Sequence, residues 1–105
     1  MQNDTEPTLW DRRDKLKIMA EIMEVAKGSQ RKTRIMYMVN LSFSQVNEYL
    51  SFLTKTGFLR VYQENGKKNY ETTPKGNLYI ENYAEMANLL RPEEEQQQEI
   101  PMLAR

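Results

Sequence analysis

Residues 31–76, RKTRIMYMVNLSFSQVNEYLSFLTKTGFLRVYQENGKKNYETTPKG, carry the local signals from which the fold can be predicted. Its apolar spacing predicts a short helix over 31–39 and a longer amphipathic helix over 43–56. Between them, Asn40-Leu41-Ser42 has the composition of a tight turn, in which Ser42 can cap the following helix. Gly57 marks the end of the second helix. Two helices joined by so short a turn predict a helix-turn-helix.

The same spacing identifies the side of each helix that faces the core. The residues expected to be buried are Ile35, Val39 and either Met36 or Met38 in the first helix, and Val46, Leu50 and Leu53 in the second. Leu41 should fill the junction between the two helices. The opposite side of the longer helix is then left for solvent or for a partner.

A hairpin follows the two helices. Residues 58–63 alternate and are rich in β-branched and aromatic side chains, which predicts a strand, and residues 68–72 form the return strand. The Asn65-Gly66 pair between them accepts the positive backbone angles of a tight hairpin turn. A helix-turn-helix followed by a basic hairpin is the arrangement of a winged helix.

One further helix is predicted on each side of this segment. Upstream, residues 11–26 form a helix that Asp11 caps and Gly28 ends. Its apolar stripe consists of Leu16, Met19, Ile22, Met23 and Ala26, with Ile18 and Val25 beside them. Downstream, Thr73-Pro74 provides a cap and a first-turn proline, and Pro92 ends or bends the helix. The predicted fold class is α+β: a winged helix-turn-helix of three helices and a two-stranded wing, with a C-terminal helix for dimerisation.

The zero net charge of the 105-residue chain hides a strong separation of charge. Residues 11–76, the expected winged domain, hold thirteen Lys or Arg against seven Asp or Glu, whereas residues 77–105 hold two against six. We expect residues 1–10 to be a disordered lead, 77–91 a dimerisation helix and 92–105 an acidic flexible tail. The basic middle fits a module that binds a polyanion, although an ordinary solvated surface can show the same excess.

Composition narrows the chemistry. With no Cys and no His, the chain lacks thiol nucleophiles, imidazole bases and the usual zinc ligands, so we expect no enzyme, no metal site and no cofactor. Carboxylate pairs at helical spacing, such as Glu21 with Glu24, are explained by solvation of an exposed face. No small-molecule ligand is evident. The absence of a signal peptide, and of an apolar run near the roughly 20 residues of a membrane helix, predicts a cytoplasmic protein without membrane contact.

The outward side of the helix over 43–56 is the surface that a recognition helix inserts into the major groove of DNA. The candidate base-contacting residues on and beside it are Ser44, Gln45, Asn47, Glu48, Ser51 and Lys55. Glu48 leaves two possibilities open. Its carboxylate can accept a hydrogen bond from cytosine N4, or it can repel phosphates and weaken docking.

Basic residues flank this surface. Three cations crowd the first turn of the helix over 31–39, where the helix dipole disfavours positive charge, so a nearby phosphate would explain them. Two lysines stand at the hairpin tip and an arginine on its stem. The candidate phosphate contacts are Arg31, Lys32, Arg34, Arg60, Lys67 and Lys68. The alternatives are that the helix cations are merely exposed and that the lysines discourage edge-to-edge aggregation.

The last helix carries more apolar and aromatic area than the first helix can cover, which suggests self-association. Tyr79, Tyr83, Met86 and Leu90 follow spacings of four, three and four, typical of a coiled-coil seam, and are the candidate dimer interface. Two heptads are marginal for a coiled coil on their own.

Four motifs resemble a known family. They are Lys32-Thr-Arg-Ile-Met-Tyr37, Asn40-Leu-Ser-Phe43, Tyr49-Leu50 and Thr73-Pro-Lys-Gly76, and they are similar to those of the archaeal winged-helix proteins of the 10a family, small chromatin-associated DNA-binding proteins. The resemblance covers roughly residues 14–90. It implies dimers, joined through a long antiparallel C-terminal helix, that bind duplex DNA with the winged domains at the two ends. Here Pro92 makes that helix shorter than the family pattern.

These features predict a dimeric archaeal transcriptional regulator, cytoplasmic and nucleoid-associated, that binds double-stranded DNA with its recognition helix in the major groove and its basic wing on the backbone. Two alternatives stay open. An architectural chromatin protein would share the fold, although a neutral net charge favours regulation over packaging. A winged-helix protein-interaction adaptor would suit Glu48, the neutral charge and the acidic tail.

Overall fold

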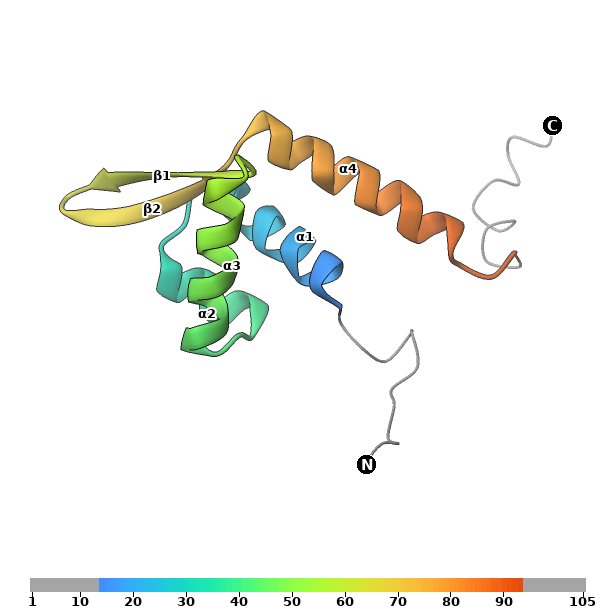
Figure 1. Ribbon diagram of the computed structural model, residues 1–105, viewed down its shortest axis with the longest axis horizontal. Helices are drawn as coiled ribbons and strands as arrows, with labels where there is room; N and C mark the ends of the chain where they lie inside the picture. Colours follow the sequence, from blue (N-terminus) through green and yellow to red (C-terminus); the bar gives the residue numbers. More distant parts are fainter. Residues whose placement is uncertain (1–13, 94–105) are drawn as a thin grey trace, which may run out of the picture.

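The structure of the chain, a computed structural model, describes residues 14–93. Within that range the elements follow the order helix, helix, helix, hairpin, helix (Figure 1). They are α1 (Lys15–Val25), the 3-10 turn η1 (Ala26–Gly28), α2 (Lys32–Val39), α3 (Phe43–Lys55), β1 (Leu59–Glu64), β2 (Lys67–Thr72) and α4 (Pro74–Leu89). This order confirms the predicted α+β winged helix-turn-helix. The expected lead at 1–10 and nearly all of the expected tail at 92–105 lie outside the described residues.

Local chemistry explains where the elements begin and end. Asp14 accepts a hydrogen bond from a first-turn amide at 2.9 Å and caps α1, so this helix begins later than expected from Asp11, which lies outside the described range. Gly57, with a φ of 86°, follows α3 as predicted. Asn65 and Gly66 both have positive φ, which confirms the tight hairpin turn.

A short backbone bridge that the sequence did not reveal is one of the links between the hairpin and the helices. β1 and β2 pair antiparallel, with Leu59 opposite Thr72 at the base and Glu64 opposite Lys67 at the tip. On the other edge of β2, the Tyr70 amide donates to the Gln30 carbonyl at 2.8 Å and the Gln30 amide donates back at 2.9 Å. Since Gln30 lies just before α2, this bridge holds the start of α2 beside the wing.

The hydrophobic core lies where α1, α2, α3 and the start of β1 meet. It contains Ile18, Ile22, Met23, Ala26, Ile35, Val39, Leu41, Val46, Leu50, Leu53 and Leu59. The predicted buried sides of α2 and α3 are confirmed, with Met36 rather than Met38 packed against the core. The expectation for Leu16 is wrong. Its side chain is 46% exposed because it lies in the first turn of α1, at an open groove beside α4.

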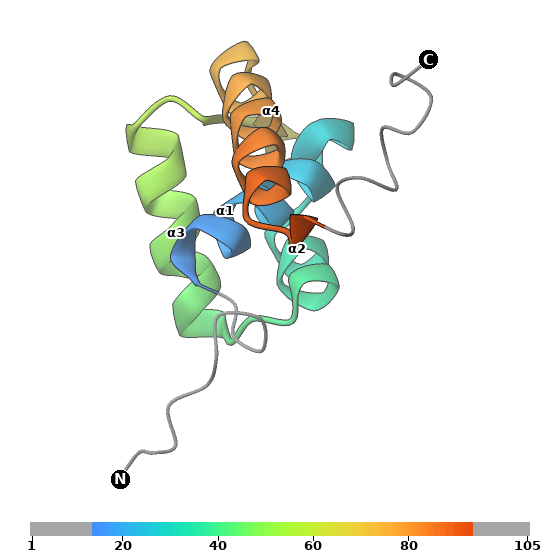
Figure 2. The ribbon, with the colours of Figure 1, turned by 90° about the vertical axis from the view of Figure 1, so that its right-hand side faces the viewer.

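α4 packs along α1 and points away from the wing (Figures 1 and 2). The Tyr79 hydroxyl donates to the Leu16 carbonyl at 2.7 Å, and the Tyr79 ring meets the Phe58 ring edge-on at 5.4 Å. Thr73 caps the helix, as predicted, by accepting from the Gly76 amide at 3.1 Å. None of the described helices combines the length and the apolar character that a bilayer crossing requires.

Candidate nucleic-acid interface

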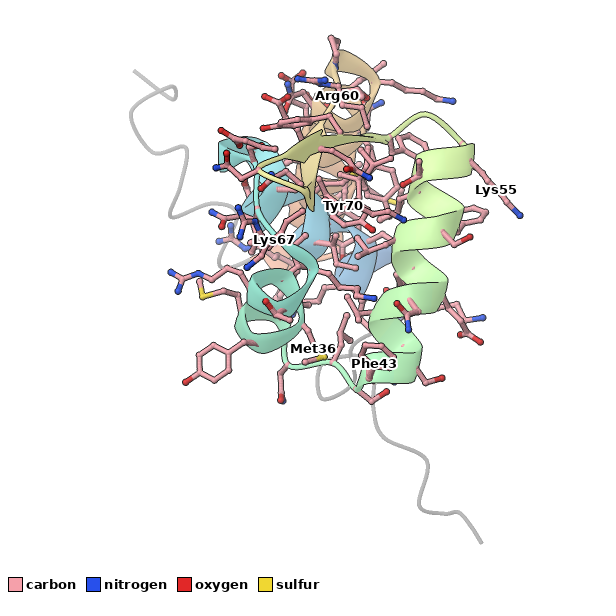
Figure 3. All side chains as sticks on the ribbon, turned by 90° about the vertical axis from the view of Figure 1, so that its left-hand side faces the viewer. Met36, Phe43, Lys55, Arg60, Lys67 and Tyr70 are labelled. Carbon is pink, nitrogen blue, oxygen red and sulfur yellow. The ribbon has the colours of Figure 1, made fainter. Side chains whose placement is uncertain are left out.

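α3, the start of α2 and the wing meet on one end of the molecule, which Figure 3 views from the hairpin tip. Two open grooves run between them. The α3–wing groove, about 320 Å³, is lined by Asn47, Leu50, Ser51, Thr54, Lys55, Val61, Lys68 and Tyr70. The α2–wing groove, about 350 Å³, is lined by Arg31, Lys32, Thr33, Lys67, Lys68 and Tyr70. Lys68 and Tyr70 line both, so the two grooves adjoin across β2.

The side of α3 that the helical period predicts to face outward is exposed in the structure. Ser44, Glu48, Ser51 and Lys55 are all exposed there, opposite the buried Val46, Leu50 and Leu53. Gln45 is exposed on one flank of this side, and Asn47 is half-buried at the edge of the α3–wing groove. The candidates flank α3 on two sides: Asn47, Ser51 and Lys55 line the α3–wing groove, whereas Gln45 and Glu48 line a groove on the α1 side, beside Lys15 and Met19.

A capping box fixes the start of α3. Ser42 accepts a hydrogen bond from the Gln45 amide at 3.1 Å, and the Ser42 amide donates to Gln45 Oε1 at 2.9 Å. The Gln45 side chain therefore stabilises the helix with its oxygen, which leaves its two N–H donors for any partner. The signal for this role was present in the sequence as Ser followed three positions later by Gln.

Lys32 joins α2 to α3. Its ammonium donates to Asn47 Oδ1 at 2.8 Å and lies 4.6 Å from the centre of the Phe43 ring. The contact with the Lys32 ammonium gives a reason for Phe43, an aromatic residue that is 61% exposed at the start of α3. The sequence marked Lys32 and Asn47 as separate candidates for different parts of DNA, and no spacing rule connects residues fifteen positions apart.

The N-terminus of α2 favours an anion. Its cap position holds Arg31, whose side chain makes no capping hydrogen bond, and its first turn contains no acidic residue. By contrast, the caps of α1, α3 and α4 all accept a hydrogen bond. Arg31 Nε is buried without a hydrogen-bond partner among residues 14–93, and Arg34, three positions later in the first turn, is exposed. Open helix amides and cations at the positive end of the helix dipole form a favourable environment for phosphate.

The wing divides the predicted cations into two groups. Lys67 and Lys68 are exposed at the tip and face the α2–wing groove. Arg60 lies apart, on the side of the hairpin away from α2 and α3 (Figure 3). There its guanidinium forms a 2.5 Å ion pair with Glu71 and stacks 4.7 Å from the centre of the Tyr62 ring. Strand register separates Arg60 from Lys68, because the Arg60–Glu71 pair and the Gln63–Lys68 pair lie on opposite faces of the hairpin. Lys67 shares the Arg60 face by alternation, but it is the first residue of β2 and lines the α2–wing groove from the hairpin tip.

The candidate dimer residues are only partly free. Tyr79 packs within the domain, and its ring stacks on that of Tyr83 at 6.4 Å. Burial, with a smaller contribution from Tyr83, raises the pKa of Tyr79 to about 12. Met86 and Leu90 are 50% and 62% exposed, and Leu89, which precedes Leu90, is 74% exposed. The end of α4 therefore presents apolar surface to solvent, to which Met86 and Leu90 contribute.

Comparison with known proteins agrees with this architecture. The sequence matches the winged helix-turn-helix family over residues 12–91. The chain therefore belongs to the winged helix-turn-helix family. Two uncharacterized proteins of the archaeon Methanocaldococcus jannaschii are each 35% identical to it, one over 83 residues and 78% of this chain, the other over 68 residues and 58%. The chain spans only 37% of the length of the first relative and 70% of the second.

Solved structures extend the comparison. Sso10a-2, a DNA-binding protein from Sulfolobus solfataricus, superposes with a TM-score of 0.72 and 27% identity, over 89% of this chain and 98% of that one. This similarity confirms the resemblance to the archaeal 10a proteins. MepR, a transcription regulator from Staphylococcus aureus, has a TM-score of 0.59 over 83% of this chain and 74% of that one. At 14% identity, MepR shows a shared fold only.

Proposed function

We propose that this protein binds double-stranded DNA and regulates transcription, with α3 in the major groove and the start of α2 and the wing tip on the phosphates. One observation carries the proposal: the exposed polar side of α3 lies on the same end of the molecule as the open, cationic N-terminus of α2 and the two lysines of the wing. A helix flanked by phosphate-binding groups is the geometry required to place side chains against base edges.

Charge on this surface supports the proposal. α2 contains no acidic residue and α3 contains one, Glu48, whereas Arg31, Lys32, Arg34, Lys55, Lys67 and Lys68 supply cations from three elements. If about five of them neutralise phosphates, the logarithm of the binding constant should fall with the logarithm of salt concentration with a slope of about −4.5. Arg60 is left out of this set because Glu71 already pairs with it.

The related structures support DNA as the ligand. Whether the protein regulates transcription or packages DNA has to be tested separately. Sso10a-2 is a DNA-binding protein and MepR is a transcription regulator. We favour regulation over packaging because the net charge of this chain is zero, whereas compaction of DNA relies on charge neutralisation independent of sequence. Selection of preferred duplexes from a random pool tests this role directly. A regulator should return a defined consensus, and an architectural protein should return none.

A protein-interaction adaptor is the second candidate, because one part of this end of the molecule is apolar. Tyr37 is 80% exposed and Met38 is 53% exposed at the end of α2. Isolated exposed apolar residues are common, but neighbouring ones fit a protein contact. Selection that enriches no duplex at tens of micromolar protein and low salt would favour the adaptor, since non-specific DNA binding by such a module should be detectable near that range.

We further propose that the protein is a homodimer joined through the exposed end of α4. Replacing both Met86 and Leu90 with Asp should yield monomers, because the change places charge in the apolar surface that would be buried. Light scattering at high micromolar concentration should give twice the 12.5 kDa chain mass for the parent and once that mass for the variant. Tyr37→Ser is the control, since Tyr37 is exposed but lies on α2. A monomeric parent would contradict the dimer.

A further inference from the structure

We propose that Lys32 is a positioning residue that holds Asn47 as a hydrogen-bond donor toward DNA, so that the base contacted by Asn47 is guanine and not adenine. The inference rests on the proposed function, because it specifies what the α3 surface recognises. It also changes the role of Lys32, which the sequence marked as a phosphate contact.

The contact between the two side chains determines how the amide is oriented. Lys32 Nζ lies 2.8 Å from Asn47 Oδ1. An ammonium group has three donors and no acceptor, so only the amide oxygen can face it and a flipped amide would lose the bond. The Phe43 ring, 4.6 Å from the ammonium, holds Lys32 from a second side. Lys32 and Asn47 are both half-buried, which limits competition from water.

This orientation restricts the bases that Asn47 can recognise. The usual pairing of Asn with adenine needs both halves of the amide, with the nitrogen donating to N7 and the oxygen accepting from N6. In this structure the Lys32 ammonium takes one of the two lone pairs of the amide oxygen and holds that oxygen toward Lys32, so the two halves of the amide cannot both turn to one base. The N–H groups remain for a ligand in the α3–wing groove, which Asn47 lines. Guanine fits a donor better than adenine does, because its major-groove edge presents two acceptors, N7 and O6.

Lys32→Met tests the inference, because it keeps an unbranched apolar stem over Phe43 and removes the ammonium. Duplexes carrying the selected site are compared with duplexes in which single G·C pairs are changed to A·T. The parent should prefer G·C at one position contacted by α3. The variant should lose that preference or shift it to A·T, because Asn47 regains its oxygen. Lys68→Met is the matched control: it should weaken binding to all duplexes alike and lower the salt slope by about 1, with the preference unchanged.

Three results would overturn the inference, and they are distinguishable from one another. If Lys32→Met behaves like Lys68→Met, then Lys32 is a phosphate contact only. If the parent prefers A·T at every position contacted by α3, Asn47 does not select guanine. If the parent binds no duplex, the proposed function fails and this inference fails with it.

The contact itself can be tested without DNA. In urea unfolding of the full chain, Lys32→Met and Asn47→Ala should be non-additive, since each removes the same hydrogen bond. Additive effects would show that the two side chains do not interact, and would overturn the positioning role even if the protein binds DNA.

Discussion

Replacing Gly76 with alanine should destabilise the domain by about 1–3 kcal/mol, the usual range for forcing a methyl group into a packed interior. Gly76 is buried in the first turn of α4, where the helix crosses the base of the hairpin. A Cβ atom there would overlap the Phe58 carbonyl oxygen and would lie 2.6 Å from Thr72 Cγ2 and 3.3 Å from the Met23 sulfur. Alanine is the better helix former by about 1 kcal/mol, but the collision involves backbone and outweighs this gain.

Urea or thermal unfolding measures this effect, and Gly28→Ala provides a control. A Cβ atom at Gly28 would meet only Gln30 Nε2, at 3.7 Å, an ordinary contact distance. We therefore expect Gly28→Ala to change stability little. Equal unfolding free energies for the two variants would contradict the close packing of α4 on the hairpin. The collision also explains the glycine in the sequence Thr73-Pro-Lys-Gly76. At the turn into α4, Thr73 caps the helix, the proline occupies its first turn, and Gly76 leaves room for the hairpin because it has no side chain.

Removing both wing lysines, Lys67→Ala with Lys68→Ala, should weaken binding to every duplex by about 10- to 100-fold near 0.1 M salt, since each lost phosphate contact contributes about 0.9 to the salt slope. Both side chains are exposed at the hairpin tip and line the α2–wing groove. The loss should not depend on sequence, because phosphates are the same at every position. Fluorescence anisotropy across a salt titration should show a slope lower by about 2.

Arg60→Ala is the matched control on the same hairpin. Arg60 lies toward the base of the hairpin, opposite Glu71, and is already paired with that carboxylate, so its removal should leave the salt slope of DNA binding unchanged. If the lysine variant kept the parent's slope, the wing tip would have no electrostatic part in binding. If Arg60→Ala lowered the slope as much as the lysine variant, the separation of Arg60 from the wing-tip lysines would be wrong.

The sequence predicted the order and type of the elements because several local signals agreed. Helical spacing, the Ser42 cap, Gly57 and the Asn65-Gly66 turn each point to the same chain path, and the structure shows all of them in place. The buried sides of α2 and α3 could be predicted from the helical spacing of their apolar residues alone. Only the choice between Met36 and Met38 needed the structure, because both positions border the apolar stripe.

Features that depend on residues far apart in the chain were not predictable in this way. The bridge between Gln30 and Tyr70 spans forty positions and involves only backbone atoms, so no side-chain pattern marks it. The contact between Lys32 and Asn47 depends on the angle between α2 and α3. Arg60 was grouped with the wing lysines because charge was counted without the pairing across the hairpin, which places Glu71 opposite Arg60 and lets the two side chains form an ion pair.

DNA binding by this end of the molecule can be mapped through backbone amide signals in NMR, during titration with a short generic duplex at low salt. We expect the perturbed amides to cluster at the start of α2, along the outward side of α3 and at the hairpin tip, at residues 31–34, 44–55 and 65–69. We also expect saturation within about 1–100 µM, the range of non-specific binding. Perturbations confined to α4, or none at these concentrations, would contradict DNA binding by this end of the molecule.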